Sequence, residues 1–316
     1  MTVNPTILVH SGVPADDPAI AALIRERHPA LTVLTASEEA EIVERLPGAE
    51  ILFAWRFPMP LLRHATSLRW LQVMGAGIET LAGAPIPDGV WVTNVRGVFS
   101  GSMAEYAIGY TLAHLQEVRR VLAQQARHEW TQFTPLRLAD LTVGVMGLGS
   151  IGGEIARAFA ALGARVVGLN RSGAAVAHVE RVYELDQIDA FLPECDVLVS
   201  VVPHTPETTG LLSGARLALL KPGCFYINVG RGNVVDIDAL TDVLRGRRIA
   251  GAALDVFPIE PLPAGHPLWD LDNVFITPHI SGVNRPNDVT DIFLVNLERY
   301  LAGEPLLNQV DVTRGY

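Results

Sequence analysis

Three side chains that could together bind an anion and transfer a proton occur in the last third of the sequence. Arg231 ends the segment N-V-G-R, Glu260 lies in L-D-V-F-P-I-E-P, and His279 lies in T-P-H-I-S-G. Arginine binds a carboxylate through two parallel hydrogen bonds. Histidine is the usual proton donor near neutral pH, and a carboxylate partner orients the ring and keeps it charged. Singly, each residue also fits an ordinary surface role, but together they predict proton transfer to a small carboxylic acid.

The segments that carry these three side chains follow short apolar runs typical of buried parallel strands. The predicted strands of this half of the chain are Val197–Val202, Phe225–Val229, Ala250–Leu254 and Val274–Thr277. Ligands bind outside the carboxyl ends of the strands in open parallel sheets. We therefore expect the arginine, the glutamate and the histidine to lie in loops at one edge of a sheet.

A glycine-rich turn lies upstream, between two further strand-like runs, Leu141–Met146 and Arg165–Leu169. In a dinucleotide-binding unit the glycines allow a tight turn, close approach of the backbone to a pyrophosphate, and close helix–strand packing. The N-terminus of the following helix binds the phosphates. The turn residues predicted to bind the cofactor are Gly147, Leu148, Gly149, Ser150, Ile151 and Gly152. The predicted apolar face of the helix consists of Ile151, Ile155, Phe159 and Leu162.

The end of the second strand bears on the choice of coenzyme. NAD-binding units place an acidic residue there to hold the ribose 2′-hydroxyl. This chain has Asn170, Arg171 and Ser172 instead. An arginine can pair with a 2′-phosphate bidentately, whereas a carboxylate would repel it. The sequence therefore favours NADP(H), with NAD(H) still possible, although a solvated surface arginine is the ordinary alternative.

The N-terminal part of the chain alternates between strand-like and helix-like segments, as is typical of a parallel α/β sheet. The predicted strands are Ile7–Val9, Leu31–Leu34, Ile51–Ala54, Trp70–Val73 and Val90–Thr93, and helices are predicted around Ile20–Arg27 and Glu38–Arg45. Trp55 and Arg56 follow one strand, and Gly75, Ala76 and Gly77 follow the next. The second of these turns could present its main-chain N–H groups to a carboxylate.

The middle of the chain predicts a link between two domains. Residues 94–103 are rich in glycine and serine and predict a hinge, and the periodicity from Met103 to about His128 predicts one long helix. A last helix, Val289–Leu301, is expected to return to the first domain.

The chain is predicted to form two domains. Residues 1–98 plus 286–316 would form the substrate domain, and residues 99–285 would form the dinucleotide-binding domain. The predicted fold class is α/β, with two doubly wound parallel-sheet domains, Rossmann-like or flavodoxin-like, and a cleft between them.

Composition narrows the class of protein further. The chain has 316 residues, 49% of them hydrophobic, which is compatible with large cores. Its net charge of −10 argues against nucleic acid or an anionic membrane as a partner. Two cysteines without C-x-x-C spacing, and no recognisable signal peptide, predict a cytoplasmic protein without a zinc site. No metal-ligand or nucleophile-elbow motif is present.

Taken together, these motifs resemble the D-isomer-specific 2-hydroxyacid dehydrogenase family over essentially the whole chain. The matching pieces are G-A-G at 75–77, M-A-E-Y at 103–106, G-L-G-S-I-G at 147–152, P-H-T-P-E-T at 203–208, N-V-G-R-G at 228–232, L-D-V-F-P-I-E-P-L-P at 254–263 and T-P-H-I-S-G at 277–282. The resemblance implies an oxidoreductase with a dinucleotide cofactor.

The resemblance also implies a role for each site residue. Arg231 would bind and polarise a 2-oxo acid, His279 would be the acid/base, and Glu260 would pair with His279. Asp255 would hold the nicotinamide carboxamide. The further implied cofactor contacts are Val202, Pro203, Thr208, Val229, Arg231, His279 and Gly282. The implied substrate contacts are Trp55, Arg56, Gly75, Ala76, Gly77 and Arg285.

Within the family the chain looks most like the glyoxylate/hydroxypyruvate reductase A branch. The similar features are W-R-F-P at 55–58, the Asn-Arg-Ser end of the cofactor strand, Arg285-Pro286 and the tail V-D-V-T-R-G-Y. This resemblance implies reduction of glyoxylate, hydroxypyruvate or a similar 2-oxo acid to the D-2-hydroxy acid by NADPH, in a homodimer formed through the dinucleotide-binding domains. One departure leaves the preferred substrate size open. Related reductases usually carry Trp in a W-x-P-L segment, where this chain has Phe133.

Two other functions remain compatible with the sequence. One is an NAD-dependent dehydrogenase of the D-lactate or phosphoglycerate type, which the Asn-Arg-Ser segment disfavours. The other is a dinucleotide-sensing co-repressor that binds partners without catalysis. Such proteins carry extra terminal segments for partner recognition, and we expect none in this protein. Formate dehydrogenases share the fold but have Gln where Glu260 stands, so we set them aside.

Overall fold

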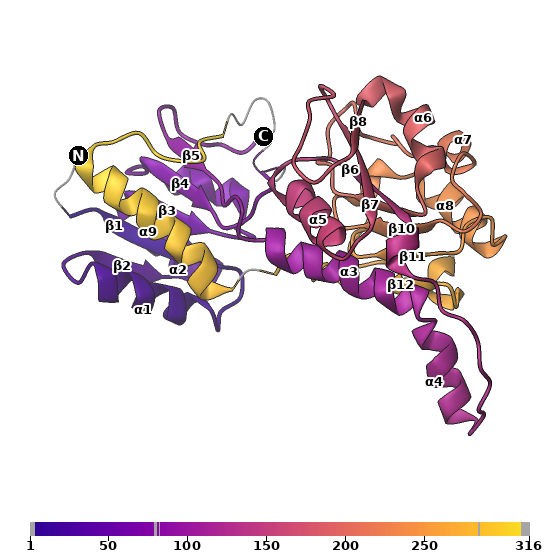
Figure 1. Ribbon diagram of the computed structural model, residues 1–316. Helices are drawn as coiled ribbons and strands as arrows, with labels where there is room; N and C mark the ends of the chain where they lie inside the picture. The colour runs from indigo at the N-terminus through magenta and orange to yellow at the C-terminus, as the bar shows by residue number, and fades with distance from the viewer. Residues whose placement is uncertain (1–3, 79–80, 82, 284, 311–316) are drawn as a thin grey trace. The chain divides into compact units, whose positions relative to one another are not determined.

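The computed structural model consists of two compact units, each built on its own sheet (Figure 1). The structure describes residues 4–78, 81, 83–283 and 285–310. The first unit comprises Met1–Val98 and Asn284–Tyr316, and the second comprises Phe99–Val283. Of the tail segment V-D-V-T-R-G-Y, only Val310 lies within the described residues.

The first unit contains a parallel sheet in the order β2-β1-β3-β4-β5. Its strands are β1 (Thr6–His10), β2 (Thr32–Thr35), β3 (Ile51–Ala54), β4 (Trp70–Val73) and β5 (Trp91–Thr93). Its helices are α1 (Asp17–Arg27), α2 (Glu39–Arg45) and α9 (Pro286–Ala302), with short 3-10 helices at Leu46–Gly48 and Met59–His64. This strand order is the flavodoxin-like one, in which the chain turns back between β1 and β3.

Both faces of this sheet are covered, because successive strand residues point to opposite sides and both sets are apolar. On one face, Phe293 of α9 stacks on Phe53 at 4.3 Å and on Trp70 at 5.0 Å between ring centres. On the other face, Leu8 and Leu52 pack in a cluster with residues of α2 and the 3-10 helices. The C-terminal helix therefore completes the core of the first unit.

The second unit contains a seven-stranded parallel sheet in the order β12-β11-β10-β9-β6-β7-β8. Its strands are β6 (Thr142–Met146), β7 (Arg165–Asn170), β8 (Arg181–Glu184), β9 (Val197–Ser200), β10 (Phe225–Asn228), β11 (Gly251–Leu254) and β12 (Val274–Ile276). Its helices are α3 (Ser100–Leu115), α4 (Val118–Ala126), α5 (Ser150–Ala161), α6 (Ile188–Phe191), α7 (Gly214–Leu217) and α8 (Ile237–Arg245). Short 3-10 helices lie at Leu138–Asp140, Leu185–Gln187, Leu192–Glu194, Gly232–Val234 and Pro267–Asp270.

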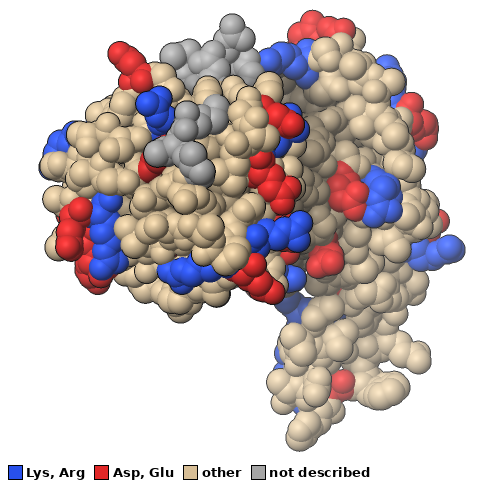
Figure 2. All heavy atoms as spheres, turned by 90° about the vertical axis from the view of Figure 1, so that its left-hand side faces the viewer, with Lys and Arg blue, Asp and Glu red and all other residues tan. Residues whose placement is uncertain are grey.

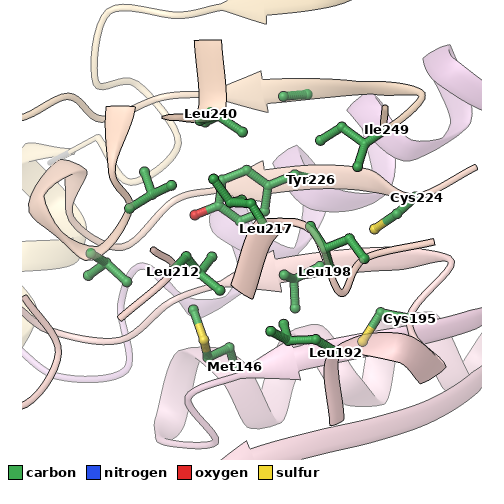
Figure 3. Close-up of a cluster of buried hydrophobic side chains, with 14 of the residues drawn as sticks. Met146, Leu192, Cys195, Leu198, Leu212, Leu217, Cys224, Tyr226, Leu240 and Ile249 are labelled. Carbon is green, nitrogen blue, oxygen red and sulfur yellow. The ribbon is translucent and has the colours of Figure 1, made fainter. Parts of the chain in front are cut away.

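The order of the strands reverses direction between β6 and β9, which is the topological switch point of a Rossmann sheet. One face of the sheet buries an apolar cluster in which Leu198 and Tyr226 of the strands meet Leu217 and Leu240 of α7 and α8 (Figure 3). Helices α3 and α5 pack against each other. The fold class predicted from the sequence, two parallel-sheet α/β units, is confirmed.

The predicted single helix over 103–128 is wrong, because the chain forms two helices. It leaves α3 at Gln116, and Glu117 adopts a left-handed backbone with φ 48° before α4 begins. The break has a tertiary cause. The guanidinium of Arg119 donates to the carbonyls of Asp272 and Val274 and lies 4.1 Å from the ring centre of Phe275. These contacts set the direction of α4. The first residues of the predicted hinge do precede α3, but from Ser100 onward this segment is helical.

Two smaller differences concern the dinucleotide-binding unit. Leu162, predicted to lie on the apolar face of α5, is 48% exposed, because α5 ends at Ala161 and Leu162 is its C-cap. Strand β8 was not predicted. Its sequence, R-V-Y-E, is half charged, as suits the edge position it occupies in the sheet.

Candidate active site

The turn at 147–152 has a backbone that only glycine accommodates at two positions. Gly147 has φ 99°, which side chains rarely adopt, and a Cβ at Gly152 would lie 1.8 Å from the carbonyl oxygen of Gly147. At Gly149, by contrast, an added Cβ would have nothing within 4 Å. The first and third glycines therefore bring the helix against the strand, and the second leaves open space above the turn.

The N-terminus of α5 presents main-chain donors at this open space. Gly153 N donates to Gly149 O at 2.8 Å, as the first hydrogen bond of the helix. Among the described residues, the N–H groups of Ser150, Ile151 and Gly152 have no acceptor. Three unsatisfied donors at the positive end of a helix dipole are suited to bind a phosphate. The residues present therefore fit the pyrophosphate of a dinucleotide.

The loops that follow neighbouring strands pack against one another along the carboxyl edge of the sheet. A Cβ at Gly147 would lie 2.9 Å from Cγ1 of Val202, and one at Gly230 would lie 2.7 Å from Val202 O. A Cβ at Gly232 would lie 2.0 Å from the carbonyl carbon of Phe257. The loops after β11, β10, β9 and β6 therefore form one continuous edge, with the dinucleotide turn at the β6 end of this row.

His279 and Glu260 are in direct contact at this edge. Nδ1 of His279 lies 2.8 Å from Oε2 of Glu260, and Oε1 of the same carboxylate accepts the N–H of Phe257 at 2.9 Å. The two side chains are 47% and 35% exposed, so solvent can reach them. Since Nδ1 faces the carboxylate, Nε2 is the imidazole atom left to exchange a proton with a substrate.

Asp255 holds the loop that carries His279. Its carboxylate is fully buried and accepts hydrogen bonds from Thr277 Oγ1 at 2.5 Å, Ile280 N at 2.8 Å and Ser281 N at 2.9 Å. Its main-chain carbonyl accepts the N–H of His279 at 3.0 Å. Asp255 therefore ties β11 to the loop after β12. The nicotinamide contact implied by the family resemblance stays a prediction.

Arg231 lies in the turn after β10, between the loops that carry Val202 and Phe257. Its side chain is partly buried, and Nη1 donates to Gly230 O at 2.9 Å. The sequence reasoning did not single out Asn228, which shapes this turn. The fully buried side chain of Asn228 accepts from Gly230 N and donates to Arg231 O, both at 3.1 Å. Asn228 could have been found from the sequence, because it is a polar residue at the end of a buried strand.

The segment after β7 forms a compact turn. Asn170 accepts the N–H of Ser172 at 3.1 Å and donates to the carbonyl of Ala174 at 2.9 Å. Its carboxamide is therefore engaged within the turn. Arg171 is exposed, and its charge acts on Glu207 in the loop after β9. A hydrogen bond from Thr205, the main-chain N–H of Glu207 and the Arg171 guanidinium together lower the pKa of Glu207.

The remaining predicted cofactor residues lie on the same unit. Val202 and Pro203 are in the loop after β9, and Thr208 donates to Pro203 O at 2.6 Å, so its hydroxyl shapes that loop. Val229 is buried behind the turn of Arg231. Gly282 faces α3, since a Cβ there would lie 3.3 Å from Sδ of Met103.

The predicted substrate contacts lie on the first unit. The indole of Trp55 covers Gly75, where a Cβ would lie 2.0 Å from Cζ3 of the ring. The carbonyls of Gly75 and Ala76 accept from Val95 N at 3.1 Å and Asn94 Nδ2 at 2.7 Å. Among the described residues, the N–H groups of 75–77 have no acceptor. This turn can therefore receive an anion.

The two arginines among the predicted substrate contacts, Arg56 and Arg285, are both exposed. Arg56 has a left-handed backbone, φ 49°, and packs on Gly12, where a Cβ would lie 2.8 Å from its own Cβ. Arg285 is the N-cap residue of α9.

In the part of the chain that the structure describes, no helix is long and apolar enough to cross a membrane. No group of three His, Cys, Asp or Glu residues in that part could hold a metal ion.

The fold and the edge residues define a class: a Rossmann-type dinucleotide-binding protein with a histidine–glutamate pair at the edge of its cofactor sheet. Residues 108–281 match the family model described as D-isomer specific 2-hydroxyacid dehydrogenase, NAD binding domain. The chain belongs to the D-isomer-specific 2-hydroxyacid dehydrogenase family, on its glyoxylate/hydroxypyruvate reductase A branch. It therefore uses a nicotinamide dinucleotide and acts on a small hydroxy or oxo acid.

Individual relatives agree with this assignment. The chain is 31% identical over 289 residues to glyoxylate/hydroxypyruvate reductase A of Serratia proteamaculans, covering 88% of this chain and 92% of the relative. A family member from Aeromonas salmonicida has a solved structure with TM-score 0.92 and 36% identity, over 98% of this chain and 99% of that one. An NADPH-dependent glyoxylate/hydroxypyruvate reductase from Sinorhizobium meliloti, solved with NADP and sulfate, has TM-score 0.90 and 30% identity, over 99% and 100%.

Proposed function

We propose that this protein reduces small 2-oxo acids, glyoxylate and hydroxypyruvate foremost, to 2-hydroxy acids, of D configuration where the product is chiral, with NADPH as coenzyme. The observation that carries the proposal is the contact between His279 Nδ1 and Glu260 Oε2, at the carboxyl edge of a dinucleotide-binding sheet. Relatives named as glyoxylate/hydroxypyruvate reductase A support the choice of substrate.

The coenzyme fits the residues of the second unit. Its pyrophosphate would lie against the open N–H groups of Ser150, Ile151 and Gly152, and the 2′-phosphate would lie near Arg171. When bound, NADPH would supply the hydride that reduces the 2-oxo carbon. We keep NADPH as the preferred coenzyme because no acidic residue ends β7.

The chain's own residues would supply the remaining chemistry. His279 would donate the proton on Nε2 to the oxygen of the former oxo group, while Glu260 holds the ring through Nδ1. Arg231 would bind the substrate carboxylate and stabilise negative charge that develops on the oxo oxygen. On the first unit, the N–H groups of 75–77 have no acceptor among the described residues and offer a place for a carboxylate next to Trp55.

We also propose that the protein is a homodimer formed through the dinucleotide-binding unit. Helix α4 and the segment after it project from the body of the second unit (Figure 1). All of α4 is described, and none of its residues is buried. The projecting part carries Leu122, Trp130 and Leu136, exposed by 59%, 90% and 55%. Uncharged side chains prevail on the one face of it that Figure 2 shows, although the segment also carries charged residues, among them Arg127 and Glu129. Apolar side chains of this size are typical of a surface that a second copy covers.

A direct assay tests the proposed reaction. NADPH oxidation is followed by its absorbance with glyoxylate, hydroxypyruvate and a longer 2-oxo acid, in the natural protein and in His279→Gln. We expect turnover with the two small acids and a roughly 10²- to 10⁴-fold lower kcat in the variant, with NADPH affinity kept. Failure of the natural protein to oxidise NADPH with any 2-oxo acid would overturn the proposal, and near-normal kcat in His279→Gln would remove the proton-donor role.

A further inference from the structure

The backbone of His279 has a conformation that needs support from its surroundings. Its φ of 55° lies in the left-handed region, which is uncommon for residues other than glycine. Its N–H donates to Asp255 O at 3.0 Å and to Thr277 O at 3.1 Å. The next two N–H groups, of Ile280 and Ser281, donate to the carboxylate of Asp255. The conformation of the loop therefore depends on the position of Asp255.

The carboxylate of Asp255 is itself held by a chain of two hydroxyl groups. Thr277 Oγ1 donates to Asp255 Oδ1 at 2.5 Å, and Tyr106 OH lies 2.7 Å from Thr277 Oγ1. A threonine hydroxyl has one proton. Since that proton points to Asp255, Tyr106 must be the donor in the second hydrogen bond. The chain therefore runs in one direction, from Tyr106 through Thr277 to Asp255.

Helix α3 fixes the start of this chain. The ring of Tyr106 lies 4.4 Å from that of Tyr110, which in turn lies 5.3 Å from Phe275 on β12, between ring centres. Burial raises the pKa of Tyr106, so its hydroxyl keeps its proton at any pH of interest. Tyr106 is therefore a permanent donor on a rigid support.

We propose that Tyr106 and Thr277 are positioning residues, which hold Asp255 so that its carboxylate keeps the loop of His279 in its left-handed conformation. The inference rests on the proposed function, in which His279 donates the proton. Neither Tyr106 nor Thr277 touches the substrate in this role. Their hydroxyl groups act only through Asp255, in series.

Because the two hydroxyl groups act one through the other, the proposal predicts how kcat should change in each variant. Thr277→Val removes a donor to a buried charged group, so kcat should fall about ten- to a hundredfold. Tyr106→Phe keeps the hydrogen bond from Thr277 to Asp255 but removes the one from Tyr106 to Thr277, so kcat should fall about two- to tenfold. The double variant should be no slower than Thr277→Val alone, because both changes act on one bond. Thr277→Ser keeps the hydroxyl and should restore most of the activity.

The chain offers a matched control in Tyr110. It lies on the same helix with its ring against that of Tyr106, and within the described residues its hydroxyl makes no hydrogen bond. Tyr110→Phe should therefore keep kcat. An equal fall in kcat in Tyr110→Phe and Tyr106→Phe would overturn the proposal, because packing of the rings would then explain the loss. The proposal would also fail if the fall in kcat of the double variant equalled the product of the falls in Tyr106→Phe and Thr277→Val.

Hydrogen exchange tests the same proposal without turnover. The amides of Ile280 and Ser281 should exchange about two- to tenfold faster in Tyr106→Phe and faster still in Thr277→Val, at unchanged helix content by circular dichroism. Unchanged exchange at both amides would overturn the proposal whatever happens to kcat. If the natural protein reduces no 2-oxo acid, the proposed function fails, yet the exchange comparison still decides whether the hydroxyl chain holds the loop.

Discussion

Glu260 holds His279 with one carboxylate oxygen while the other is fixed by the main chain of its own loop. The distances are 2.8 Å to Nδ1 of His279 and 2.9 Å to the N–H of Phe257. Both side chains are more than one-third exposed, so this contact contributes little to the stability of the fold. Its effect is instead on the orientation of the imidazole.

Glu260→Gln should slow reduction. The carboxylate holds the imidazole ring through Nδ1 and places a negative charge beside it, whereas the amide carries no charge. We expect kcat for glyoxylate to fall about tenfold, since the contact is partly exposed to solvent. Glutamine can still accept from Phe257, so the loop should persist. An unchanged kcat would remove Glu260 from the proposed proton transfer.

Gly75→Ala should impair substrate binding. The new methyl group would lie 2.0 Å from Cζ3 of Trp55, so the indole has to move away from the turn at 75–77. We expect a roughly tenfold or greater rise in KM for glyoxylate, with the affinity for NADPH unchanged. Gly101→Ala is the control, because an added Cβ there meets nothing within 4 Å. Normal KM in Gly75→Ala would show that Trp55 does not contribute to the substrate site.

The parts of the site that could be predicted from the sequence are those with local physical requirements. The turn at 147–152 requires glycine at Gly147 and Gly152, so its sequence already indicates the backbone geometry. The sequence also placed Arg231, Glu260 and His279 on strand ends, because short β-branched runs mark buried parallel strands. These features depend on neighbours in the chain.

The parts that could not be predicted depend on residues far apart in the sequence. The break at Glu117 follows from contacts of Arg119 with β12, more than a hundred residues later. The hydrogen bond between Tyr106 and Thr277 likewise joins the first helix of the unit to the residue that follows its last strand. Nothing in M-A-E-Y indicates that the tyrosine supports the loop of a histidine. Strand β8 was missed because half of its residues are charged.

The dimer can be tested at the projecting segment. Leu122→Asp with Trp130→Ala places a charge on α4 and removes the exposed ring of Trp130 from the segment after it, so we expect the mass by light scattering to halve. Neither residue is buried within the chain, so the melting temperature of the monomer should change little. Phe133, whose ring packs under Arg120 at 4.3 Å, is left intact. A monomeric mass for the natural protein would end the proposal.

The choice of coenzyme can be tested at Arg171. An arginine paired with the 2′-phosphate favours NADPH, and screening by solvent and salt should reduce the effect to roughly tenfold in kcat/KM. Arg171→Ala should therefore raise the NADH/NADPH ratio of kcat/KM about tenfold. Asn170→Asp should raise it too, because it adds repulsion. That aspartate could still accept from Ser172 N, although it would lose the bond to Ala174 O.

A variant of Glu207 gives a second test of the role of Arg171, because the Glu207 carboxylate is close enough to Arg171 for their charges to interact. A bound 2′-phosphate would have to share the guanidinium with Glu207. Glu207→Gln should therefore increase the preference for NADPH, in the opposite direction to Arg171→Ala, and the effect should weaken as salt is raised. Arg245→Ala, an exposed arginine paired with Asp242, is the matched control and should leave the ratio unchanged. A natural preference for NADH, or an unchanged ratio in Arg171→Ala, would contradict the role given to Arg171.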